Sequence, residues 1–257
     1  MKKLQSLLVC SLLVNLMFFG LAGYVIERRG GISYLVSLVT ASSEAPARYI
    51  ESPLYHGRKS NFASLPRDDG AVIFAGDSIT DFARWSELLQ YPVLNRGIAG
   101  DTIEGLRQRM DEILKHQPSQ LFIMIGVNDL NGGATSRHLF IEYGALIEEI
   151  KTTSPQTQIF LQSILPVNIP SWRAATGWDL PPEVTQSILE VNEALSDIAD
   201  GNQILYIDLY SELVADGDLL DEQYTSDGLH LNGAGYLKWR DVVLPYLEPN
   251  LVEQEVL

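Results

Sequence analysis

The stretch AVIFAGDSITDF, residues 71–82, joins an apolar run directly to the polar triplet Gly76-Asp77-Ser78. Residues 71–75 are apolar without alternation, which is typical of a strand buried on both faces. Ser78, with Asp81 three residues later, fits a capping box in which the hydroxyl accepts a hydrogen bond from a backbone N–H at a helix start. A serine held where a strand becomes a helix is also a candidate nucleophile. The stretch alone favours the cap, so the choice depends on the rest of the chain.

Four further apolar runs follow, at 92–94, 121–125, 159–161 and 204–207. Helical stripes of apolar residues separate them, within 103–114, 139–150 and 184–198. This alternation predicts an α/β fold, in which a parallel sheet carries helices on both faces. Ligands of such sheets bind outside the carboxyl ends of the strands. The segments to inspect are therefore those that follow each run, together with SDGLHLN at 226–232.

These segments contain the parts of an acyl-transfer site. Ser78 is the candidate nucleophile and His230 the candidate base, because an imidazole transfers protons near neutral pH. Asp227, three residues before His230, can orient the ring. The candidate donors to an oxyanion are the backbone N–H groups of Ser78 and Gly100 and the side-chain amide of Asn128.

Four quoted blocks resemble those of the SGNH (GDSL) serine hydrolases: AGDSITDF (75–82), NRGIAGDTIEGLRQR (95–109), LFIMIGVNDL (121–130) and SDGLHLNGAGY (226–236). The likeness is to the bacterial branch similar to platelet-activating-factor acetylhydrolase subunits and lysophospholipase L1, and it runs from about residue 53 to 246. It implies a flavodoxin-like three-layer α/β/α sandwich with a five-stranded parallel sheet. It also implies a triad of Ser78, Asp227 and His230, with Gly100 and Asn128 donating to the oxyanion.

The N-terminus predicts a membrane segment. Lys2 and Lys3 precede an uncharged run from Leu7 to Ile26, which is long enough for a helix to cross a bilayer. We expect a membrane anchor or uncleaved signal at 1–30, a juxtamembrane linker at 31–52, the hydrolase domain at 53–247 and an acidic tail at 248–257. The basic start favours an extracytoplasmic domain. The alternative is cleavage near 20–22, which gives a secreted or periplasmic protein.

The net charge and the cysteine content limit the kinds of partner and cofactor that the protein can bind. The formal charge of -15 argues against nucleic acid, because phosphate binding needs a positive surface. The single cysteine, Cys10, excludes an intrachain disulfide and a cysteine-rich metal site. We expect no metal or organic cofactor. Two rival classes have weaker signals: a nucleotide-binding protein, from Gly97 and Gly100 before a helix, and a metal-dependent hydrolase, from the aspartates at 77, 81, 101 and 129.

The predicted function is a serine ester hydrolase that cleaves short-chain or lipid carboxylic esters through an acyl-serine intermediate. A carbohydrate O-acetylesterase and a non-catalytic binding domain on the same fold are the alternatives. The expected partners are small-molecule, lipid or glycan esters, and the membrane through the N-terminal helix. Asp77, Trp172 and Trp178 are candidate substrate contacts. Both tryptophans lie in residues 165–182, a stretch without helical periodicity that predicts a long loop at the site.

Overall fold

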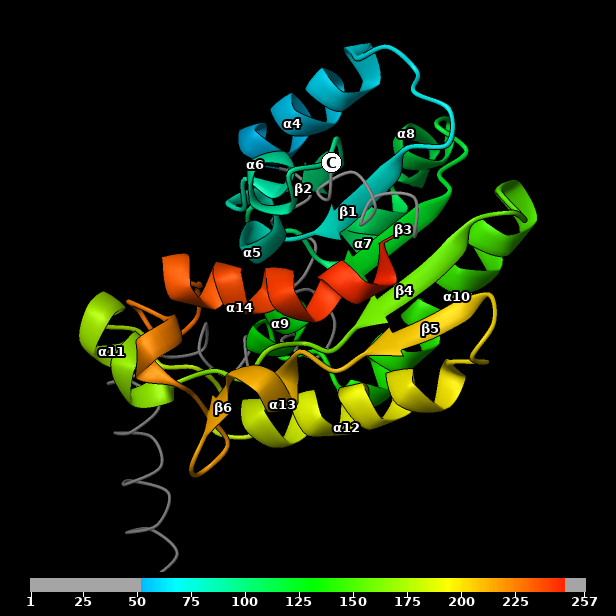
Figure 1. Ribbon diagram of the computed structural model, residues 1–257. Helices are drawn as coiled ribbons and strands as arrows, with labels where there is room; N and C mark the ends of the chain where they lie inside the picture. Colours follow the sequence, from blue (N-terminus) through cyan, green and yellow to red (C-terminus); the bar gives the residue numbers. More distant parts are fainter. Residues whose placement is uncertain (1–51, 248–257) are drawn as a thin grey trace, which may run out of the picture. The chain divides into compact units, whose positions relative to one another are not determined.

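A computed structural model describes residues 52–247, and a five-stranded parallel sheet is its centre (Figure 1). The strands are β1 (Val72–Gly76), β2 (Leu94–Gly97), β3 (Gln120–Met124), β4 (Gln158–Gln162) and β5 (Ile204–Ile207). They are ordered β2-β1-β3-β4-β5, and each neighbouring pair is parallel. The predicted sheet is confirmed, and its order is the flavodoxin-like one. A short antiparallel pair, β6 (Val214–Ala215) and β7 (Leu219–Leu220), lies apart from it.

Helices occupy the connections between the strands. Before and between the first three strands lie α4 (Pro53–Ser64), α5 (Ser78–Asp81), α6 (Trp85–Leu89), α7 (Ile103–Arg107) and α8 (Met110–Leu114). After β3 come α9 (Val127–Asn131), α10 (Ser136–Thr153), α11 (Ile169–Thr176), α12 (Val184–Ile198), α13 (Tyr210–Leu213) and α14 (Gly233–Val243), with short 3₁₀ turns at Glu222–Tyr224 and Leu244–Tyr246.

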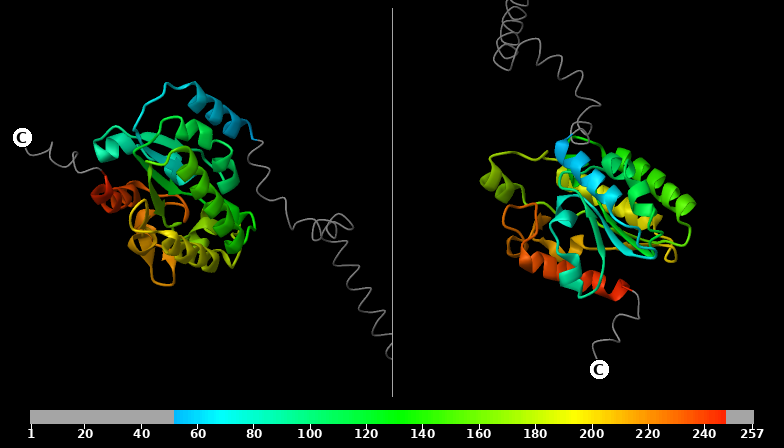
Figure 2. Two further views of the ribbon diagram at one scale, coloured as in Figure 1. Left: turned by 90° about the vertical axis from the view of Figure 1, so that its right-hand side faces the viewer. Right: turned by 90° about the horizontal axis from the view of Figure 1, so that it is seen from above.

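The helices form two layers around the sheet, as the right-hand view of Figure 2 shows. On one face α10 packs against α12, α7 and α8. On the other face α14 packs against α6 and α13. The described residues therefore form the predicted α/β/α sandwich. All five strands end at the same edge, beside α5, α9 and α11 (Figure 1).

The core explains why the strands read as continuous apolar runs. Phe74, Phe122 and Phe160 are register partners on β1, β3 and β4, and their rings stack with centroid distances of 4.5 and 4.3 Å. Trp85 of α6 stacks on Phe74 at 4.2 Å and meets Trp239 of α14 edge-on at 4.7 Å. This aromatic row fixes α6 and α14 on one face of the sheet, since ring pairs of this kind add to the free energy of burial.

Two helical regions differ from the sequence prediction. The stripe within 103–114 is two short helices, because the chain breaks at Arg109 and turns that side chain inward, where it is fully buried. The predicted loop at 165–182 is wrong in part, because it contains α11. Its signals were local: Asn168 accepts a hydrogen bond from Ser171 N as N-cap, Pro170 lies in the first turn, and Gly177 ends the helix at φ 76°.

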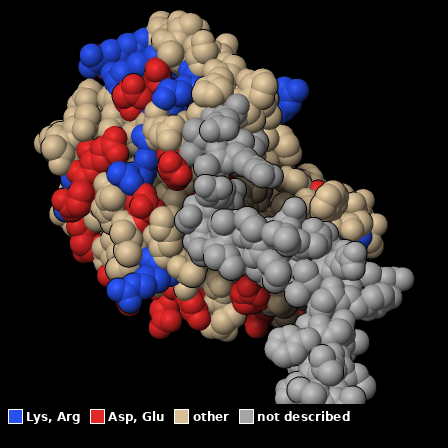
Figure 3. Space-filling view, turned by 180° about the vertical axis from the view of Figure 1, so that it is seen from behind, with Lys and Arg blue, Asp and Glu red and all other residues tan. Residues whose placement is uncertain are grey.

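The predicted membrane anchor at 1–30, all but the last residue of the linker, and the tail at 248–257 lie outside the described residues. Between residues 52 and 247, no helix is long and apolar enough to cross a bilayer. On the face seen in Figure 3, acidic side chains are interspersed with basic ones.

Candidate active site

The turn from β1 into α5 presents Ser78. Asp77, not Ser78, is the N-cap of α5: its Oδ1 accepts a hydrogen bond from Ile79 N at 3.0 Å. The expected capping box is therefore wrong, and the Ser78 hydroxyl points to a different partner. The helix α5 can pack closely against the neighbouring strand β2 because Gly97 on β2 has no side chain. A Cβ at Gly97 would lie 2.3 Å from Asp81 N of α5.

Ser78, His230 and Asp227 form a chain of hydrogen bonds. Ser78 Oγ lies 3.0 Å from His230 Nε2, although the two residues are far apart in sequence. His230 Nδ1 lies 2.7 Å from Asp227 Oδ2. A carboxylate can only accept, so Nδ1 carries a proton and a neutral ring presents the lone pair of Nε2 to the serine hydroxyl. The three residues that the sequence analysis grouped are together in space.

The environment of Asp227 favours its charged form. Burial acts to raise the pKa of this carboxyl, but hydrogen bonds outweigh burial and lower the pKa below its usual value. They come from the His230 ring and from the backbone N–H groups of Leu229, at 2.9 Å, and His230, at 2.8 Å. Asp227 is thus an anion at neutral pH, held rigidly against the imidazole.

Two residues that the sequence analysis did not single out hold the segment at 225–230, which carries Asp227 and His230, in place. Thr225 Oγ1 donates to the His230 carbonyl at 2.7 Å and accepts from Gly228 N at 2.9 Å. A threonine two residues before Asp-Gly is a turn signal that could have identified it. Tyr236 Oη, on α14, donates to the Ile79 carbonyl at 2.8 Å. That bond ties the histidine-bearing segment to the helix that carries Ser78.

The loops after β2 and β3 bring Gly100 and Asn128 to the same edge of the sheet. Gly100 has φ 80°, a left-handed conformation that glycine adopts without strain. Asn128 Nδ2 donates to the Asp101 carbonyl at 2.9 Å, so one of its two amide hydrogens fixes the side chain against the Gly100 loop. Ile103 N donates to the Asp129 carboxylate at 3.2 Å, a second bond between the same two loops.

The remaining aspartates have separate partners. Burial raises the pKa of Asp77 and of Asp129 to about 7, against the opposing bonds from Ile79 and Ile103. Burial also raises the pKa of Asp101 to about 6, while its ion pair with Arg109 acts in the other direction. Asp81 pairs with Arg58. In the described part of the chain, no three His, Cys, Asp or Glu side chains are arranged to hold a metal ion.

Aromatic rings flank His230. The Phe82 ring centroid lies 5.4 Å from that of His230, and Phe82 is 55% exposed. The Trp172 ring, on α11, lies 6.4 Å from the imidazole on a tilted plane. Trp178 is 75% exposed. Of the two tryptophans singled out from the sequence, the structure thus places Trp172 beside the histidine, and Phe82 is an addition that the sequence analysis missed.

Comparison with known proteins agrees with the resemblance to GDSL hydrolases that the sequence motifs indicated. The model of the GDSL-like lipase/acylhydrolase family matches residues 74–238. A protein assigned provisionally as a platelet activating factor from Streptococcus pneumonia is 25% identical, with a TM-score of 0.66 over 84% of this chain and 99% of its own. A GDSL-like lipase from Bacteroides thetaiotaomicron is 23% identical, with a TM-score of 0.59 over 75% and 96%.

An acetyl xylan esterase shares the fold at 22% identity, with a TM-score of 0.54 over 69% of this chain and all of its own. No curated protein matches. The family model covers more than half of the chain and includes the turn at Ser78 as well as His230. The chain therefore belongs to the GDSL-like lipase/acylhydrolase family.

Proposed function

We propose that this protein hydrolyses carboxylic esters through an acyl-serine intermediate. The observation that carries the proposal is the pair of hydrogen bonds from Ser78 Oγ to His230 Nε2, at 3.0 Å, and from His230 Nδ1 to Asp227 Oδ2, at 2.7 Å. A serine hydroxyl is a weak nucleophile unless a base takes its proton, and this arrangement supplies both the base and the group that orients it.

In the first half-reaction His230 Nε2 takes the proton of the Ser78 hydroxyl while Oγ attacks the ester carbonyl carbon. The oxyanion that forms accepts hydrogen bonds from the N–H groups of Ser78 and Gly100 and from the second amide hydrogen of Asn128. The intermediate collapses, and His230 returns the proton to the departing alcohol. Water then attacks the acyl-serine with the same base, which releases the acid and restores Ser78.

The class of ester is proposed from the surroundings of the triad. Phe82 and Trp172 offer apolar contact surface beside His230. Such surface suits an acyl chain or the face of a sugar ring, so short-chain esters, carbohydrate acetyl groups and lysophospholipids are the substrates to compare. Trp178 stays a secondary candidate for substrate contact, whereas the Asp77 side chain is buried and caps α5, which leaves it no surface for such a contact. We also propose that the uncharged run at 7–26 anchors the enzyme at a membrane, with the domain on the extracytoplasmic side.

The test is hydrolysis of p-nitrophenyl esters, from acetyl to palmitoyl, by the full chain in detergent. Ser78→Ala should lower kcat by about 10³-fold or more, since it removes the nucleophile. Ser86→Ala is the matched control, because the Ser86 hydroxyl bonds the Val93 carbonyl, outside the triad. Mass spectrometry of the wild-type protein should find the acyl group on Ser78.

The chain-length profile separates the substrate classes. Hydrolysis confined to short chains favours acetyl esters, and acetylated xylan is then the next substrate to test. Hydrolysis of long chains favours lysophospholipids. Full activity of Ser78→Ala would contradict the proposal, and failure on all of these esters would favour a binding domain.

A further inference from the structure

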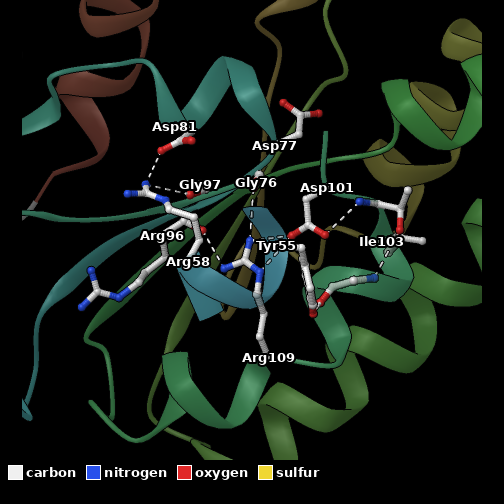
Figure 4. Close-up of polar contacts among 12 residues, drawn as sticks. Tyr55, Arg58, Gly76, Asp77, Asp81, Arg96, Gly97, Asp101, Ile103 and Arg109 are labelled. Carbon is white, nitrogen blue, oxygen red and sulfur yellow. Dashed lines mark hydrogen bonds and ion pairs between the residues drawn. The ribbon is translucent and has the colours of Figure 1, made fainter. Parts of the chain in front are cut away.

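Arg109 lies under the candidate active site, fully buried at the break between α7 and α8. Its guanidinium contacts three different segments. Nη1 donates to the Arg96 carbonyl on β2 at 2.8 Å, and Nη2 donates to the Gly76 carbonyl on β1 at 3.2 Å. Nε donates to the Asp101 carboxylate at 2.9 Å. Figure 4 shows this side chain directed at the ends of the two strands, with Asp101 beside it.

Asp101 continues the network into the loop that follows β2. One carboxylate oxygen pairs with Arg109 and the other accepts from Thr102 N at 3.0 Å. The Asp101 backbone N–H donates to the Ile98 carbonyl at 3.0 Å. Its carbonyl accepts from Asn128 Nδ2 at 2.9 Å. Every polar group of Asp101 is therefore used to hold the loop around Gly100.

Each proposed oxyanion donor is connected to an atom of this network, either by a short stretch of chain or by a hydrogen bond. Ser78 follows Gly76 by two residues, Gly100 directly precedes Asp101, and the amide of Asn128 is itself bonded to Asp101. We propose that Arg109 is a positioning residue for ester hydrolysis, because it holds these three donors in one arrangement through Asp101 and the two strand ends. The inference rests on the proposed function.

The chemistry of the side chain supports a role in positioning. A guanidinium is planar and presents its donors in a rigid fork, so it can bridge several fixed acceptors, whereas a lysine ammonium on a flexible chain cannot. A buried ion pair is also weak evidence for stability, because removing two charges from water offsets much of their attraction. An apolar side chain of similar volume could stabilise the fold as well as Arg109 does. Only the guanidinium can hold the two strand ends and Asp101 in a fixed arrangement.

The experiment measures kcat for each reactive serine. Arg109→Met and Arg109→Lys are made in the full chain, and the fraction of competent sites is counted by labelling Ser78 to completion with a fluorophosphonate. We expect kcat per labelled site to fall about 10²-fold in Arg109→Met, the loss that a displacement of about 1 Å can cause, with little change in KM. Arg109→Lys keeps a cation opposite Asp101 but not the fork, so we expect it to recover at most a small part of kcat.

Leu195→Ala on α12 is the control for lost stability, because it removes a fully buried side chain far along the chain from the loops of the site. It should lower the labelled fraction or the midpoint of urea unfolding and leave kcat per labelled site unchanged. If Arg109→Met does not fold, the comparison is made on Arg109→Lys alone, whose kcat per labelled site should still be at least tenfold low.

A kcat per labelled site within twofold of wild type in a folded Arg109 variant would overturn the inference and leave the proposed function intact. A wild-type chain that neither hydrolyses esters nor labels at Ser78 would overturn both. The two failures are thereby distinguished.

Discussion

Asp77 and Asp227 each adjoin a candidate catalytic residue, Ser78 and His230 respectively, and their surroundings favour opposite charge states. Asp77 directly precedes Ser78, is almost completely buried and accepts a hydrogen bond from Ile79 N; burial raises its pKa to about 7. Asp227 is partly exposed and accepts bonds from the His230 ring and two backbone N–H groups, which together lower its pKa.

The difference shows that burial and hydrogen bonding, not residue type, decide what a carboxyl group can do at this site. An ionised Asp227 stabilises the imidazolium that forms when His230 takes a proton. A carboxyl that is half protonated near neutral pH cannot supply the same fixed charge. Asp77 instead lies between the end of β1 and the start of α5 and caps that helix. The predictions below test this contrast, beginning with the largest expected effect.

Asp227→Asn should lower kcat by about 10³- to 10⁴-fold, because an amide next to His230 Nδ1 neither holds the productive tautomer nor stabilises the imidazolium. Asp77→Asn should lower kcat less than tenfold, since the amide oxygen can still accept from Ile79 N. Both are measured with the best p-nitrophenyl ester at saturating concentration.

Asp221→Asn is the matched control for this pair. It makes the same substitution six residues before Asp227, where the carboxylate bonds Gln223 instead of the histidine, and kcat should not change. If Asp227→Asn retained a tenth of wild-type kcat, the charge of Asp227 would not be what activates His230.

The second prediction concerns the free energy of unfolding, for which the substitution at Asp77 is expected to have the favourable effect and that at Asp227 is not. The pKa of Asp77 is higher in the folded state, at about 7, than its ordinary value of 3.8, so the folded protein binds more protons between these values. Its contribution to the free energy of unfolding is therefore full below pH 4 and lost as pH rises to 7. Asp77→Asn should gain stability relative to wild type over that range, by on the order of 2–4 kcal/mol at pH 8.

Urea unfolding of wild type and Asp77→Asn from pH 4 to 8 measures this gain. Asp227→Asn serves as the opposite case: its lowered pKa contributes stability above the unfolded value that is lost as pH falls, so it should show no gain between pH 4 and 7. Parallel pH profiles for wild type and Asp77→Asn would mean that Asp77 is ionised in the folded protein across the whole range.

The sequence was sufficient to predict the parts of the fold and of the candidate site that depend on local pattern. Continuous apolar runs identified β1, β3, β4 and β5, because strands covered on both faces have no polar side. The run at 92–94 only reaches the start of β2, whose sequence Leu94-Asn95-Arg96-Gly97 is mostly polar. The rule that ligands bind at the carboxyl ends of strands then placed Ser78, Gly100 and Asn128 at one edge of the sheet before any distance was known. Asp227 and His230 follow no strand of the sheet; their chemistry and the resemblance to the SGNH hydrolases grouped them with Ser78.

The parts it missed depend on contacts between distant residues. Nothing local distinguishes Ser78 from Asp77 as the N-cap, since both residue types are good caps. Arg109 reads as the polar side of an amphipathic helix, because two of its three acceptors are backbone carbonyls, which leave no mark in the sequence. Phe82 lies beside His230 only once α5 and the segment before α14 have packed together.

The smallest expected effect belongs to a third aspartate, Asp81, whose exposure lies between those of Asp77 and Asp227. Its carboxylate pairs with Arg58 of α4 and accepts from Ala99 N at 3.2 Å. The Arg58 side chain is 36% exposed and that of Asp81 is 16% exposed. Arg58→Met should therefore cost about 1 kcal/mol or less in the free energy of unfolding, as for ion pairs open to water.

Salt provides the decisive measurement for Arg58. Screening weakens an exposed pair, so the difference between wild type and Arg58→Met should shrink as sodium chloride is raised, whereas the pH-dependent gain of Asp77→Asn should hardly change. Lys59→Met, the neighbouring substitution on α4, removes only a contact with the Gln108 carbonyl and gives the baseline. A salt-independent loss above 2 kcal/mol in Arg58→Met would place Asp81 with the buried Asp77 and not between the two carboxylates.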